Sequence, residues 1–106
     1  MRARVVTMTL PVLIIALVSL ACGGGISEAE THFQSALELE AEGRFEEAIL
    51  EYDQAIGLDI RYTEAYTNRG GLYLDLARPQ LAIEDSTRAI ELDPENAYAY
   101  ANRGGA

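Results

Sequence analysis

Two hydrophobic patterns divide the chain. Residues 5–21 form a nearly continuous apolar run, whereas beyond residue 26 apolar residues recur every three or four positions. The second pattern predicts amphipathic helices, and nothing alternates with period two, so we expect an all-α protein without strands. The expected helices run from Ser27 to a left-handed cap at Gly43, from Phe45 to Gly57, from Thr63 to Leu76, from Pro79 to a stop at Asp93, and from Glu95 to Gly104.

The predicted helices recur with a fixed period. Residues 48–71 and 82–105 align at an offset of 34 residues and are identical at 12 of 24 positions. A period between about 20 and 50 residues is typical of a solenoid. We therefore expect an α-solenoid of about two and a half helix–turn–helix repeats, at residues 29–62 and 63–96, with a truncated third repeat at residues 97–106.

Charge narrows the class of partner. Beyond residue 26 the chain has six Arg, no Lys and 17 Asp and Glu residues, a net charge of −11. Such a surface repels phosphate backbones, which argues against nucleic acid as a partner. The carboxylate clusters Glu46–Glu47, Glu84–Asp85 and Glu91/Asp93/Glu95 lack the spacing and the glycine of a calcium loop, so we interpret them as solvated helix faces.

No candidate for catalysis or cofactor binding emerges from the sequence. The only histidine, His32, occupies a packing position on its helix and is expected to be half-buried. Ser, Thr and Cys22 have no neighbouring histidine that could activate a nucleophile. We expect no catalytic residue, no metal site and no cofactor.

The first 26 residues resemble an export signal. Arg2 and Arg4 precede the apolar run, and its end, Val18-Ser19-Leu20-Ala21-Cys22, resembles the lipobox of bacterial lipoproteins. The resemblance implies a signal peptide at residues 1–21 and a diacylated Cys22 as the new N-terminus. Residues 22–26 would then be the lipidated Cys and a Gly-rich tether, with the repeat domain at residues 27–106. Ordinary signal cleavage with soluble export, or an uncleaved anchor, are the alternatives.

The repeat unit resembles the tetratricopeptide repeat. That family places bulky, small and aromatic side chains in order along the first helix, where the second repeat has Tyr66, Gly70 and Tyr73. Small residues recur in its second helix at Ala82 and Ala89, and small side chains let neighbouring helices approach closely. Pro94 also fits the pattern, whereas Ser86 stands where an aromatic residue is usual. The resemblance covers residues 29–106.

The resemblance implies a concave groove that takes up a peptide. Its candidate lining residues, carried over by position, are Phe33, Leu37, Glu40, Thr67, Asn68, Gly71, Asp75, Tyr98 and Asn102. An amide offers both donor and acceptor, so Asn68 and Asn102 could hold a peptide backbone, or they could serve packing between repeats. A chaperone-tail clamp would need cations where this chain has Phe33, Leu37, Tyr98 and Asn102, so that ligand is not expected.

The sequence thus favours a protein–protein interaction module that binds a protein or peptide ligand and is lipid-anchored to the bacterial cell membrane on its exported side. The alternative is an N-terminal spacer fragment of a larger exported enzyme or receptor. A third candidate is self-association through the open C-terminal repeat, whose apolar face is only partly covered.

Overall fold

The computed structural model describes residues 26–106, which form five helices and no strand. The helices are α2 (Glu28–Ala41), α3 (Phe45–Leu58), α4 (Thr63–Asp75), α5 (Pro79–Leu92) and α6 (Ala97–Gly105). The predicted signal peptide and Cys22 lie outside the described residues. None of the helices in residues 26–106 combines the length and the apolar composition needed to cross a membrane.

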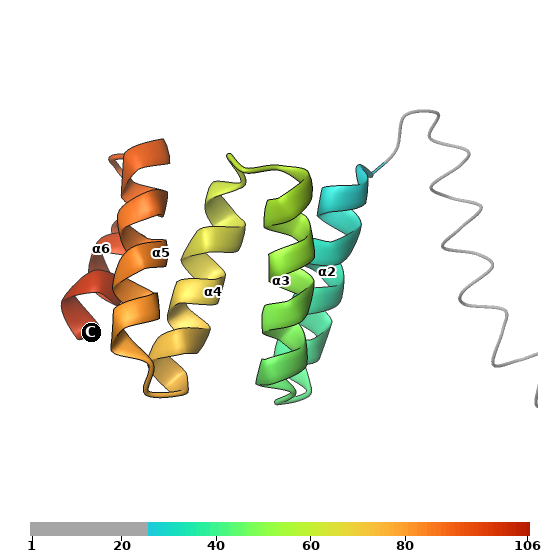
Figure 1. The fold of residues 1–106 in the computed structure, drawn as a ribbon, viewed down its shortest axis with the longest axis horizontal. Helices are drawn as coiled ribbons and strands as arrows, with labels where there is room; N and C mark the ends of the chain where they lie inside the picture. The colour runs from blue at the N-terminus through green and yellow to red at the C-terminus, as the bar shows by residue number, and fades with distance from the viewer. Residues whose placement is uncertain (1–25) are drawn as a thin grey trace, which may run out of the picture.

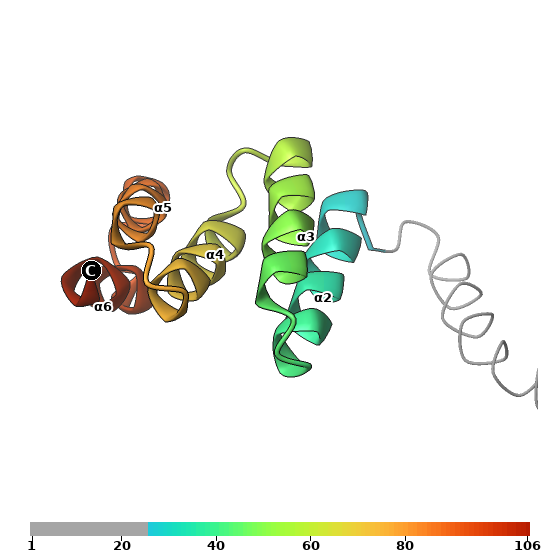
Figure 2. The same cartoon turned by 60° about the horizontal axis from the view of Figure 1, so that its bottom comes forward.

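The helices stack as successive antiparallel hairpins (Figures 1 and 2). α2 packs on α3 and α4 on α5, while α3–α4, α5–α6 and α4–α6 contacts join the hairpins. The radius of gyration is 16.4 Å, compared with about 12 Å for a compact domain of similar length. This elongated stack confirms the predicted solenoid of about two and a half repeats.

The helix ends follow local sequence signals. Ser27 and Glu30 form a capping box at the start of α2, and Pro79 occupies the first turn of α5. The expected start of the last helix at Glu95 is wrong, because Asn96 is the N-cap and its Oδ1 accepts a hydrogen bond from the Ala99 amide at 3.1 Å. α4 likewise ends at Asp75, one residue earlier than expected.

Small residues let the helices pack closely. The alanines at seven positions are completely buried, and a Cβ added at Gly70 of α4 would lie 3.3 Å from the Asp85 Cβ and the Ser86 Oγ of α5. Ser86 is itself fully buried, and its hydroxyl has no hydrogen-bond partner among the described residues. The small Ser86 side chain therefore fills the aromatic position of the family beside Gly70. The buried alanines are Ala36, Ala48, Ala55, Ala65, Ala82, Ala89 and Ala99.

The first repeat fills the same region with aromatic rings. Tyr52 of α3 is completely buried, and the Phe33 ring lies 5.7 Å from it and stacks on Tyr62 at 4.9 Å. His32 is half-buried, as expected, and its Nδ1 lies 2.9 Å from the Glu51 carboxylate. These contacts anchor α2, the first helix of the stack.

A buried ion pair joins three helices. Arg69 of α4 donates two hydrogen bonds to Asp85 of α5, at 2.7 and 2.8 Å, and a third to Asp53 of α3 at 2.6 Å. Interpreting Asp85 as part of a solvated face is therefore wrong, since the residue is only 5% exposed. Burial raises the pKa of the Asp85 carboxyl above its usual value, and the hydrogen bonds from Arg69 act in the opposite direction.

The turns within the two hairpins share one backbone conformation. Gly43 has φ +76°, as the sequence predicts, and Ala77, which aligns with it 34 residues later, has φ +56°. In both turns the next amide donates back across the helix end, from Arg44 to Leu39 and from Arg78 to Tyr73. Ala77 is thus a non-glycine residue in the left-handed region, which disfavours a Cβ.

This pair of turns predicts two opposite changes in stability. Ala77→Gly should raise the free energy of unfolding by about 0.5–1 kcal/mol, because relief of left-handed strain exceeds the added unfolded-state entropy. Gly43→Ala should lower it by about 1 kcal/mol, and a Cβ there would meet no atom within 4 Å, so packing does not enter. Urea unfolding of both variants measures this, and two changes of the same sign would contradict it.

Candidate functional site

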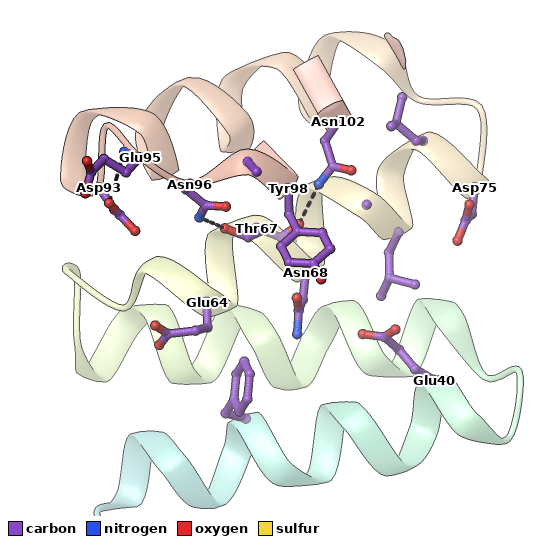
Figure 3. Close-up of a pocket in the computed structure, with 15 residues that line it drawn as sticks. Glu40, Glu64, Thr67, Asn68, Asp75, Asp93, Glu95, Asn96, Tyr98 and Asn102 are labelled. Carbon is purple, nitrogen blue, oxygen red and sulfur yellow. Dashed lines mark hydrogen bonds between the residues drawn. The ribbon is translucent and has the colours of Figure 1, made fainter. Parts of the chain in front are cut away.

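A groove with a volume of about 900 Å³ follows one side of the stack. Its lining comes from α2, α4, α6 and the loop before α6, and no residue of α3 or α5 contributes. Because the first helix of each repeat faces the groove, one ligand could touch all three repeats. Figure 3 shows the Tyr98 ring and the Asn68 amide near the middle of this groove.

Eight of the nine groove residues expected from the sequence line this groove. They are Phe33, Glu40, Thr67, Asn68, Gly71, Asp75, Tyr98 and Asn102. Leu37 does not line it. At about 100° per residue, Phe33 and Glu40 lie almost in line along α2, whereas Leu37 is turned by about 40° from Phe33.

Seven lining residues escape the sequence analysis, and they differ in how visible they are. Glu64 lies three and four residues before Thr67 and Asn68, so helical periodicity alone could have found it. Asp93, Glu95 and Asn96 belong to the α5–α6 connection, which periodicity cannot place. The remaining three are Leu72, Leu74 and Ala97.

Thr67 is the hydrogen-bonding centre of the groove floor. Its hydroxyl donates to the Thr63 carbonyl at 2.9 Å and accepts from Asn96 Nδ2 at 2.8 Å, while its own carbonyl accepts from Asn102 Nδ2 at 3.0 Å (Figure 3). These bonds hold α6 against α4. The Asn102 donor therefore serves packing between repeats, and Oδ1 has no hydrogen-bond partner within residues 26–106.

Asn68 belongs to a second polar network. It lies beside the Tyr52 hydroxyl, which donates a hydrogen bond to the Glu40 carboxylate. Burial, reinforced by the hydrogen bond to Glu40, raises the pKa of the Tyr52 hydroxyl. The hydroxyl thus stays protonated at neutral pH and fixes Glu40 at the groove wall.

Charge in the groove has one sign. Its lining includes five carboxylates and no Arg, Lys or His. They are spread from Asp93 and Glu95 at one end to Asp75 at the other, with Glu40 and Glu64 between them (Figure 3). Within residues 26–106, no group of three or more His, Cys, Asp or Glu side chains could hold a metal ion.

Family models match the repeat region. A model described as "TPR repeat" matches residues 41–76, and one described as "Tetratricopeptide repeat" matches residues 63–96. The second match spans the same residues as the repeat predicted from the sequence period. No curated protein matches the chain.

Solved structures with the same fold include three repeat domains. The second TPR of Spaghetti (RPAP3), bound to the HSP90 peptide SRMEEVD, is 31% identical with a TM-score of 0.72, covering 74% of this chain and 72% of that one. The Arabidopsis OM64 TPR domain is 28% identical with a TM-score of 0.71, covering 73% and 64%. The first TPR of Spaghetti, bound to the same peptide, is 26% identical with a TM-score of 0.69, covering 73% and 63%.

Sequence identity, coverage and fold therefore agree with the two family-model matches and with the 34-residue period. The chain belongs to the tetratricopeptide repeat family.

Proposed function

We propose that this chain is a protein-interaction module that binds an extended segment of a partner protein in the groove between α2, α4 and α6. The observation that carries the proposal is the groove itself, about 900 Å³ in volume and lined by the first helix of every repeat. Two structurally similar domains hold a peptide, which supports a peptide or protein as the ligand here.

The groove offers the contacts that an extended peptide needs. Tyr98 is 79% exposed, and its ring can cover an apolar side chain of the ligand. Asn102 presents Oδ1 as an acceptor for a backbone N–H, since its Nδ2 already donates to Thr67. Asn68 adds a second amide on the same side of the groove. Backbone contacts of this kind bind a segment without fixing its sequence.

The proposal extends to a lipid tether. The lipobox-like sequence before Cys22 supports export, diacylation of that cysteine and attachment to the bacterial cell membrane, with Gly23–Gly25 as a flexible spacer. Several acyl chains, each contributing about 0.8 kcal/mol per buried methylene, would hold the chain stably at the bilayer. The repeat domain would then meet its partner near the membrane surface.

Site-specific photocrosslinking tests the groove. A benzophenone amino acid replaces either Tyr98 in the groove or Leu50 on α3, which is also well exposed at 61%. We expect a discrete protein adduct in host cells from position 98 and none from position 50. Adducts from position 50 alone, or from neither position, would contradict the proposal.

Gly71→Phe provides the blocking variant. A Cβ at Gly71 would lie 3.6 Å from Asn102 Nδ2, an ordinary contact, so the ring can occupy the groove without disturbing the helix packing. We expect the yield of adduct from position 98 to fall by about tenfold or more, with no loss of thermal stability. An unchanged yield would show that the adduct forms outside the groove.

The tether has its own test. The intact mass of the protein from its host's membranes should correspond to a chain beginning at Cys22 plus acyl chains. Cys22→Ala should abolish the added mass and the cleavage, because the acylated residue is gone. A chain beginning at Cys22 without added mass would indicate ordinary export, and an uncleaved wild-type chain would indicate an anchor; either result would contradict lipidation.

A further inference from the structure

We infer that the groove selects a cationic ligand: an extended partner segment in which Arg or Lys residues alternate with apolar residues. The inference rests on the proposed function, since it names the chemical class of the peptide bound at that site. It depends on where the carboxylates lie, which of them are paired, and what the groove offers beside them.

The groove carboxylates have no cationic partner in the described chain. None of the five, Glu40, Glu64, Asp75, Asp93 and Glu95, takes part in a salt bridge within residues 26–106. Glu40 accepts from Tyr52, and Asp93 accepts only from the Glu95 backbone amide at 3.1 Å. Their negative charge is therefore available to a ligand.

Acidic residues elsewhere are mostly neutralised. Seven of the 12 carboxylates outside the groove pair with Arg or His, among them Asp53 and Asp85 with Arg69. Since no Arg lines the groove, the basic residues of the chain serve the other faces. The charge left uncompensated is concentrated where a ligand would lie.

Two of the groove carboxylates also oppose the dipole of their own helix. Glu40 lies in the last turn of α2 and Asp75 is the last residue of α4, and neither turn contains a basic residue. A negative charge at a helix C-terminus is unfavourable for the helix. These side chains therefore do not stabilise their helices through charge, whereas a cationic ligand would compensate both.

The other lining residues define the apolar half of the ligand. Phe33, Leu72 and Leu74 supply apolar surface, and Tyr98 supplies an exposed aromatic face. An Arg guanidinium stacks favourably on such a face while its charge lies beside carboxylates. By contrast, the HSP90 peptide SRMEEVD of the two Spaghetti structures ends in three acidic residues out of four, and this groove would repel that end.

The test measures binding to a graded set of peptides. Fluorescein-labelled peptides of constant length and constant apolar content run from all-Arg to all-Glu at their charged positions, and anisotropy reports binding to the purified full chain in detergent. We expect the all-Arg peptide to bind most tightly and its affinity to fall as salt is raised, because exposed charges are screened.

Matched charge variants locate the effect. The double variant Glu64→Gln/Asp75→Asn should weaken binding of the all-Arg peptide by about tenfold, or about threefold for each exposed carboxylate. Glu38→Gln/Glu84→Gln removes the same charge from exposed positions outside the groove and should change binding by less than about twofold. All four residues are partly or fully exposed, and circular dichroism checks that the fold persists.

The outcomes separate the inference from the function on which it rests. Equal binding of all peptides, competed away by Gly71→Phe, would overturn the cationic preference and leave the groove as the binding site. Equal weakening by both double variants would also overturn it, because the attraction would then come from net charge. Absence of binding by every peptide would overturn both claims.

Discussion

The arrangement of this protein depends on the close approach of its helices through residues that have almost no side chain. Seven alanines are completely buried, and Gly70 of α4 lies against the Asp85 and Ser86 side chains of α5. Such close packing fixes the crossing of successive helices. Because every hairpin packs in the same way, α2, α4 and α6 fall on one side of the stack, and the groove between them follows from the repeat.

The same geometry sorts the charges. Arg69 reaches Asp53 and Asp85 between α3, α4 and α5, so the acids on that side are paired within the stack. The side formed by the first helices has no arginine, and its carboxylates remain without cationic partners in the described residues. Internal pairing and external binding are thus assigned to opposite sides of one helix, α4, which carries both Arg69 and the central groove residues.

The sequence predicts this fold well because the repeat states its own period. Identical residues 34 positions apart place the helices, and Ser27, Gly43 and Pro79 mark their ends. What failed depends on tertiary contacts: Asp85 resembles a solvated acid until Arg69 is placed beside it. Groove residues on helices were found through periodicity, whereas those in the α5–α6 connection, such as Asp93 and Asn96, have no period to reveal them.

Mapping a bound peptide onto the chain tests the account most directly. Backbone amide resonances would be followed by NMR while an Arg-rich peptide is added to the full chain in detergent. The account predicts shifts at Asn68, Gly71 and Asn102, which line the groove, and none at Gly57 or Glu84 on α3 and α5. Shifts confined to α3 and α5, or no shifts with any peptide, would contradict binding in the groove.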